Sequence, residues 1–214
     1  MLSFIQKQVE ENPDISAREL SNAVVRTARS RNEKNACPDD ISCMVIYLRK
    51  PRRLHLLTRS PFYKESDAAF AELVRNFDGK SVLCDGTTAK IISRELRRPI
   101  EIDIKLSAQC GGLPLPAKIR GIDLVTEGIL TLTDVVQRIE KGDAPVTPLP
   151  LAARKMVELF RNSDDIELVV GTKVNEAHQD PNLPVDLEIR RNIVKRLKVV
   201  LEEKYRKRVL MRYF

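Results

Sequence analysis

The apolar positions near the start of the chain repeat once per helical turn. Leu2, Ile5 and Val9 have this spacing, which predicts a helix over residues 2–10. A second helix is expected from residue 17 to about 31, because Ser16 and Glu19 have the spacing of a capping box. After a polar stretch, residues 41–48 form a mostly apolar run that predicts a buried strand. Residues 1–50 are therefore expected to form a helix–helix–strand unit.

A short charged segment with a proline, residues 49–53, marks a boundary, and it predicts two domains, 1–50 and 54–214. Beyond it, short apolar runs alternate with amphipathic stretches. The runs predict strands at 54–57, 80–84, 100–104, 121–126, 166–170 and 208–214. The amphipathic stretches predict helices at 66–77, 89–97, 132–141, 149–161 and 185–204. This alternation indicates an α/β fold with a mostly parallel sheet flanked by helices.

Composition narrows the class of protein. The chain has 214 residues, 43% of them hydrophobic, and no apolar run long enough to cross a bilayer, so we expect a cytoplasmic protein without a membrane partner. The two histidines lack metal-ligand spacing, and the cysteines form no C-x-x-C pair, so we expect reduced thiols. The cysteines are Cys37, Cys43, Cys84 and Cys110.

A net charge of +7 raises the question of whether the protein binds nucleic acid. The basic residues are dispersed among acidic ones, and aromatic residues make up only 5% of the chain, too few for a stacking platform. We therefore expect no nucleic-acid partner. The basic amphipathic helix at 185–204 is expected to pack against the sheet, since a strand follows it, rather than to lie on a membrane.

The first candidate ligand site is a turn where a strand leads directly into a helix. Its residues are Cys84, Asp85, Gly86, Thr87 and Thr88. Such a turn exposes backbone N–H groups at the positive end of the helix dipole, which favours a phosphate, and Gly86 would let the ligand approach closely. The alternative is that Thr87 only caps a helix that begins at residue 89.

A second candidate segment, Thr126-Glu127-Gly128, follows the strand expected at 121–126. Glu127 is placed to accept hydrogen bonds from a ribose or an amine, or to hold a metal with Asp85. The alternative makes Glu127 a solvated loop residue, with Thr131 capping the next helix. Because both segments follow strand ends in an α/β sheet, we expect them to face one crevice. Lys173 lies in a third loop of this kind, where it would complement the charge of a phosphate; the simpler interpretation is a solvent-facing lysine.

Residues 16–48 resemble the end of type 2C metal-dependent phosphatases, especially the stage II sporulation protein E family. The resemblance rests on an amphipathic helix, a polar loop that ends in Asp39-Asp40-Ile41, and an apolar closing segment. It implies that Asp39 or Asp40 occupies a ligand position of a binuclear manganese or magnesium centre. Such centres need several oxygen ligands, and the family's other ligands precede this segment, so we expect no competent phosphatase and no tightly bound metal.

Residues 57–141 resemble the accessory domain that follows the catalytic domain in some members of this family. The matching segments are Thr58-Arg59-Ser60-Pro61, Cys84-Asp85-Gly86-Thr87-Thr88-Ala89 and residues 124–132, with Asp85 where those members have glycine.

Together these features predict the C-terminal part of a protein serine/threonine phosphatase whose α/β domain binds a phosphate-bearing or acidic ligand in a regulatory role. Two alternatives are a small α/β enzyme acting at the site formed by Asp85, Thr87, Thr88 and Glu127, and a pure interaction domain. The apolar run at 41–48 lacks the strands that would pair with it, so we also expect a homodimer.

Overall fold

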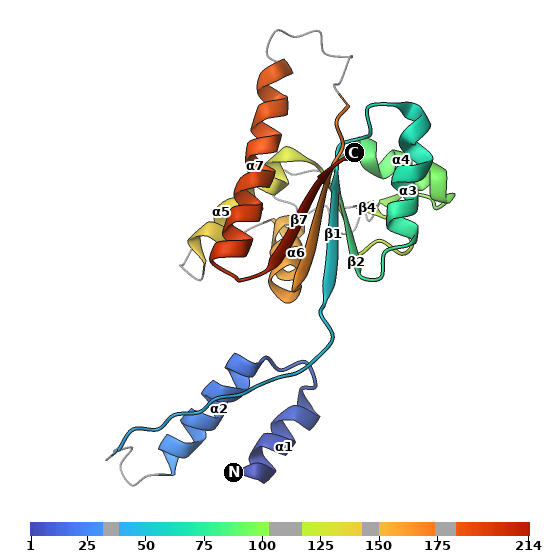
Figure 1. Cartoon of the computed structure of the whole chain (residues 1–214). Helices are drawn as coiled ribbons and strands as arrows, with labels where there is room; N and C mark the ends of the chain where they lie inside the picture. Colours follow the sequence, from blue (N-terminus) through green and yellow to red (C-terminus); the bar gives the residue numbers. More distant parts are fainter. Residues whose placement is uncertain (32–38, 103–116, 143–149, 174–182) are drawn as a thin grey trace. The chain divides into compact units, whose positions relative to one another are not determined.

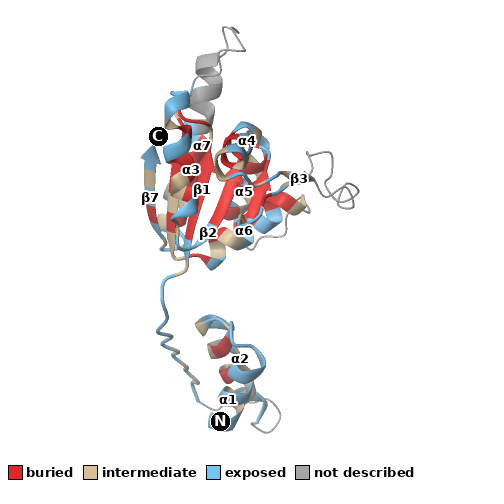
Figure 2. Cartoon of the chain, turned by 90° about the vertical axis from the view of Figure 1, so that its right-hand side faces the viewer, coloured by how far each residue is buried: buried red, intermediate tan, exposed pale blue. Residues whose placement is uncertain are grey.

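The computed structural model describes residues 1–31, 39–102, 117–142, 150–173 and 183–214, with the backbone alone described at 183–190. These residues form two compact units, Met1–Lys50 and Pro51–Phe214. In Figure 2 the second unit contains most of the buried residues, whereas burial in the first is confined to part of α2.

The first unit contains two helices, α1 (Leu2–Glu11) and α2 (Ala17–Ser30). The predicted capping box at the start of α2 is confirmed. The Glu19 N–H donates to Ser16 Oγ at 3.2 Å, and the Ser16 N–H donates to Glu19 Oε2 at 3.0 Å. Among the described residues of this unit, Leu20 and Val24 of α2 are the buried apolar ones.

The predicted strand at 41–48 is wrong. The segment is extended but belongs to no sheet (Figure 1). One side contacts α2, where Ser21 Oγ donates to the Cys43 carbonyl at 2.9 Å. The other side is exposed and apolar, with Met44, Ile46 and Leu48 accessible to solvent. A strand requires a neighbour for its backbone groups, and the described residues of this unit provide none, so the apolar pattern alone does not produce a strand.

The second unit is built on one sheet of seven strands among the described residues, in the order β3-β4-β5-β2-β1-β6-β7. Strands β5, β2, β1, β6 and β7 are parallel neighbours, and β3 and β4 extend the sheet antiparallel beyond β5. The strands are β1 (Arg53–Thr58), β2 (Lys80–Cys84), β3 (Glu101–Ile102), β4 (Ala117–Lys118), β5 (Leu124–Thr126), β6 (Asp165–Val170) and β7 (Arg208–Tyr213).

Helices cover both faces of this sheet, as Figure 1 shows. On one face lie α3 (Asp67–Arg75), which follows a short 3-10 turn at Lys64–Ser66, and α4 (Gly86–Leu96). On the other lie α5 (Ile129–Lys141), α6 (Leu151–Asn162) and α7 (Leu183–Glu203). Successive residues of β1 face opposite helix layers: Leu56 packs toward α5, α6 and α7, and Leu57 packs toward α3 and α4.

The α/β fold with a mostly parallel sheet is therefore confirmed. From β1 the chain runs outward through β2 to β5, and then returns to place β6 and β7 on the other side of β1. This reversal puts a topological switch point between β1 and β6, where α/β sheets commonly bind ligands.

Some element bounds differ from those expected. Helix α4 begins at Gly86 rather than at residue 89, and α5 at Ile129 rather than at residue 132. The two-residue strand β4 was not predicted, because so short a run carries no periodicity. The last helix packs on the sheet as expected, with Val194 and Leu197 fully buried in the core. Within the described ranges, no helix combines the length and apolarity needed to cross a membrane.

Candidate functional site

The carboxyl ends of the parallel strands bring the predicted site residues together. Strands β2 and β5 are neighbours, and their register pairs Cys84 with Thr126, the last residue of each strand. The segments that follow, Asp85-Gly86 and Glu127-Gly128, therefore leave the sheet side by side. An ideal Cβ placed on Gly86 would lie 3.3 Å from Glu127 Oε1, so the Glu127 carboxylate lies directly beside this glycine.

Asp85, not Thr87, caps helix α4. Its Oδ2 accepts from the Thr88 N–H and from Thr88 Oγ1, both at 3.2 Å. The alternative in which Thr87 caps the helix is wrong because the helix begins at Gly86, which leaves Thr87 exposed in the first turn. Asp at an N-cap is favoured because its carboxylate satisfies an N–H group that lacks a partner within the helix.

Buried polar groups fix the strand ends beneath this edge. Thr58 Oγ1 donates to the Cys84 carbonyl at 2.9 Å, which ties β1 to β2. The buried Cys84 thiol donates to the Gly128 carbonyl at 3.4 Å. Thr126 Oγ1 donates to Thr131 Oγ1 at 3.1 Å. Thr131 lies inside α5 and does not cap it, so the predicted Thr131 cap is wrong, although Glu127 is an exposed loop residue as that alternative stated. The side chains of Cys84, Thr126 and Thr131 therefore link the ends of β2 and β5 to the start of α5.

Two carboxylates at the start of α4 change the chemistry expected there. Asp85 already accepts from one first-turn N–H group, and the exposed Glu127 lies beside Gly86. A phosphate at Gly86–Thr88 would meet both negative charges at short range, which opposes the attraction of the helix dipole. A hydroxyl or ammonium group would instead donate to Glu127. The geometry at this edge favours a donor ligand over an anion.

The switch point between β1 and β6 is closed by the chain itself. The Gly171 N–H donates to the Thr58 carbonyl at 2.9 Å, and the Lys173 N–H donates to the Ser60 carbonyl at 3.1 Å. An ideal Cβ on Gly171 would lie only 2.2 Å from the Ser60 carbonyl oxygen, so backbone meets backbone. Arg59, with φ of 65°, donates a hydrogen bond to the Lys173 carbonyl. Hydrogen bonds of its N–H and carbonyl groups therefore fix the backbone of Lys173.

Asp39 and Asp40 lie in the first unit and are exposed. The Asp40 N–H donates to Asp39 Oδ1 at 2.8 Å, so one carboxylate of the pair accepts from its neighbour's backbone. Among the residues that the structure describes, no group of three or more His, Cys, Asp or Glu side chains is arranged to hold a metal ion.

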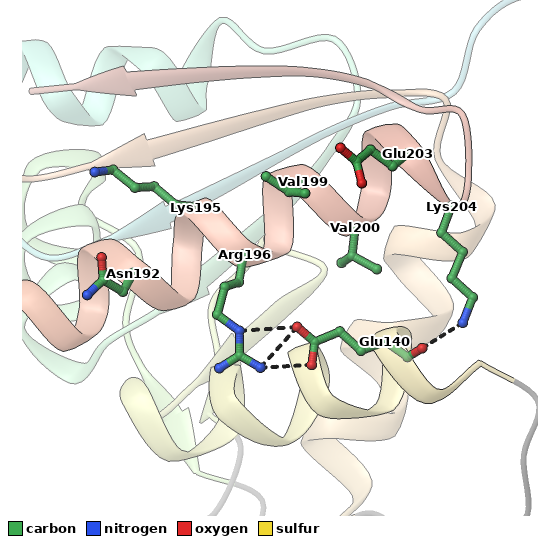
Figure 3. A pocket seen from close by; sticks show the side chains of 8 residues that line it. All are labelled: Glu140, Asn192, Lys195, Arg196, Val199, Val200, Glu203 and Lys204. Atoms are coloured by element: carbon green, nitrogen blue, oxygen red, sulfur yellow. Dashed lines mark hydrogen bonds and ion pairs between the residues drawn. The ribbon is translucent and has the colours of Figure 1, made fainter.

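Two hollows away from this edge were not anticipated. One, of about 480 Å³, lies along α7 and the end of α5 and is shown in Figure 3. Part of its charge is paired. Nε and Nη2 of Arg196 donate to the Glu140 carboxylate at 2.8–3.1 Å, and Lys204 Nζ donates to the Glu140 backbone carbonyl at 2.6 Å. The other, of about 410 Å³, is lined by Arg97, Arg98 and Arg120. The residues of each lie far apart in sequence, so no local motif marks them.

Comparison with protein-family models, with curated proteins and with solved structures finds no match to this chain.

Proposed function

We propose that residues 51–214 form a ligand-binding regulatory domain that follows the end of a phosphatase domain of the stage II sporulation protein E family and acts in the cytoplasm. The family part of the proposal rests on the sequence segments at 16–48 and 57–141. The ligand part rests on one observation: Glu127 lies exposed beside Gly86 at the carboxyl edge of the sheet. A ligand there donates hydroxyl or amine hydrogens to Glu127 and contacts the Thr87 hydroxyl.

A binding role is favoured over catalysis by the use of Asp85. Its carboxylate accepts two hydrogen bonds from Thr88 and so stabilises the start of α4. A general base must instead reach a proton of its substrate. Glu127 remains as the exposed carboxylate of the pair, and a single carboxylate is sufficient for recognition.

The ligand part is tested by thermal shift with nucleosides, sugars, amino acids and polyamines, followed by calorimetry on each compound that stabilises the chain. Glu127→Gln should weaken binding about tenfold or more, the loss typical of a charge-assisted hydrogen bond. Glu158→Gln, which changes an exposed glutamate on α6, is the matched control and should bind as the parent does. No shift with any compound, or equal binding by Glu127→Gln, would favour an interaction domain instead.

The phosphatase part predicts that the isolated chain does not hydrolyse phosphoprotein or p-nitrophenyl phosphate with manganese. Asp39 and Asp40 supply too few oxygen ligands for two hard cations. The measurement is a steady-state assay with increasing manganese. Turnover that Asp40→Ala abolishes would contradict this prediction.

A further inference from the structure

The three arginines of the second hollow come from two loops far apart in the sequence. Arg97 and Arg98 follow the end of α4, and Arg120 lies in the turn that precedes β5. With Pro99 and Gly121 they line a pocket of about 410 Å³. The pocket borders the amino end of β5, so it lies at the opposite edge of the sheet from Glu127, which follows the carboxyl end of the same strand. It is a separate place on the domain.

Local hydrogen bonds hold the first loop. Arg97 ends α4 in the left-handed conformation, with φ of 53°, and the Arg98 N–H donates to the Ser93 carbonyl at 2.9 Å. Ser93 Oγ donates in turn to the Arg98 carbonyl at 2.6 Å. These bonds fix the backbone from which two adjacent guanidinium groups extend, and so reduce the entropy lost when a ligand is bound.

Arg98 links this loop to the second. Its Nη1 donates to the Arg120 carbonyl at 3.0 Å. Gly121, with φ of +80°, makes this approach possible, because an ideal Cβ there would lie 2.8 Å from the same nitrogen. Any other residue at 121 would be strained in backbone conformation and would push Arg98 away. Gly121 therefore serves both the backbone conformation of the turn and the approach of Arg98 to it.

The charges of this pocket are not neutralised within the described part of the chain. None of Arg97, Arg98 and Arg120 forms an ion pair with a described carboxylate, and none of the described residues that line the pocket is acidic. Other arginines of the domain do have such partners: Arg196 pairs with Glu140, as Figure 3 shows, and Arg208 pairs with Asp165. Three guanidinium groups around one concave surface repel one another, and an anion between them removes that repulsion.

We propose that this pocket binds a small phosphate-bearing molecule. Planar guanidinium groups donate two parallel hydrogen bonds to phosphate oxygens, and several arginines around a pocket of this size can bind one phosphate group from more than one side. The described lining residues include no aromatic side chain on which bases of a nucleic acid would stack. The proposal does not depend on the Glu127 site, which recognises donor groups at the other edge.

The test is calorimetric titration of the full chain with inorganic pyrophosphate at one fixed, low ionic strength. Saturable binding is expected. Arg120→Gln should weaken it about tenfold or more, which is the loss typical of one charge-assisted interaction. Arg97→Gly should weaken it to a similar degree, yet leave the thermal midpoint in the absence of ligand unchanged or raised, because glycine adopts the left-handed conformation at lower cost.

Arg206→Gly is the matched control. Arg206 also follows a helix and also has positive φ, 54°, but it lies outside the pocket. It should bind pyrophosphate as the parent does. The absence of saturable binding would overturn the proposal, and so would equal weakening in Arg206→Gly. Tighter binding of a single-stranded oligonucleotide that is lost in the same two pocket variants would replace the small ligand with a nucleic acid.

Discussion

At the scale of single residues, glycines decide where parts of this chain meet. Gly86 allows Glu127 to lie beside the start of α4, Gly121 allows Arg98 to reach the next loop, and Gly171 allows two backbone segments to meet at the switch point. Each glycine has a different neighbour, and a methyl group added to each would have a different effect. The contacts of Gly171 and Gly86 therefore predict different outcomes for the same substitution to alanine.

Gly171→Ala should be strongly destabilising. Its Cβ would meet the Ser60 carbonyl oxygen at 2.2 Å, and that oxygen is fixed by the Lys173 N–H. We expect a loss of about 2 kcal/mol or more in the free energy of unfolding, measured by urea denaturation. Gly86→Ala is the control. It meets the end of the flexible Glu127 side chain at 3.3 Å, so it should change stability much less. Equal effects of the two variants would contradict the proposed closure.

His55 makes the domain sensitive to acid. It is buried in β1, its Nε2 lies 2.7 Å from Ser81 Oγ, and its ring stacks on Phe77 with the centroids 3.9 Å apart. Burial, with smaller contributions from the charges of Arg212 and Arg53, lowers the pKa of His55 from 6.5 to about 4. The unfolded chain therefore binds this proton before the folded chain does. The contribution of neutral His55 to the free energy of unfolding is complete above pH 6.5 and is lost as the pH falls through about 4.

The resulting loss is on the order of 3 kcal/mol between these limits. Urea denaturation from pH 7 to pH 4 should show this decline, and His55→Asn should reduce its slope. Because the substitution also removes the stacking on Phe77, the slope and not the absolute stability is the informative quantity. A pH dependence that is unchanged in the variant would show that other groups cause the decline.

At the scale of elements, local sequence signals predicted elements of both units. Strand β2 begins and ends where the pattern places it, and the capping box of α2 is present as Ser16 and Glu19 predict. The signals are local in both cases. The start of α4 was missed because Asp85 and Thr87 are both acceptable caps, and the choice depends on how β2 leads into the helix.

The strand expected at 41–48 failed for a different reason. Its apolar residues are compatible with a buried strand, but a strand forms only where a second strand pairs with it. The same limit applies to the candidate site. The proximity of Glu127 and Gly86 was predictable from the rule that parallel strands share a carboxyl edge. The closure at Gly171 and the arginine pocket were not, because both depend on loops brought together by the whole sheet.

Substitution of Asp85 tests how much its capping hydrogen bond contributes to the stability of the domain. Asp85→Ala should lower the free energy of unfolding by about 1 kcal/mol, since the Thr88 N–H loses its acceptor. Asp85→Asn keeps a capping oxygen and should retain most of that stability. Chemical denaturation with circular dichroism measures both variants. If Asp85→Asn were as destabilising as Asp85→Ala, the charge of Asp85 and not its capping bond would be the important property.

At the scale of the whole molecule, the exposed apolar side of residues 41–48 predicts self-association. Met44, Ile46 and Leu48 are 83%, 74% and 89% exposed, and this segment makes no backbone-to-backbone hydrogen bond with other described residues. Unpaired extended backbone with apolar side chains favours pairing with another chain. We expect a homodimer, and we expect residues 51–214 alone to be a folded monomer.

Sedimentation equilibrium should show the dimer for the full chain. A variant with serine at 44, 46 and 48 should be monomeric at the same concentration. Leu130→Ser, which removes an exposed apolar side chain from the second unit, is the control and should remain dimeric. A monomeric parent chain, or a dimer that survives the triple substitution, would contradict a contact through this segment.

The extended segment also has a consequence for proteolysis. Residues 40–50 lie in no helix or strand, and this segment carries Arg49, whereas the Arg52 carbonyl already accepts from the Asp164 and Asp165 N–H groups at the edge of the sheet. A protease must bind its substrate as extended chain, so trypsin needs no unfolding of the sheet to cleave here. Cleavage at this segment should proceed at the same rate whether or not the sheet is stabilised, whereas cleavage within residues 53–102 must await the opening of the domain. Brief digestion should therefore cleave the chain after Arg49 while residues 53–102 remain intact.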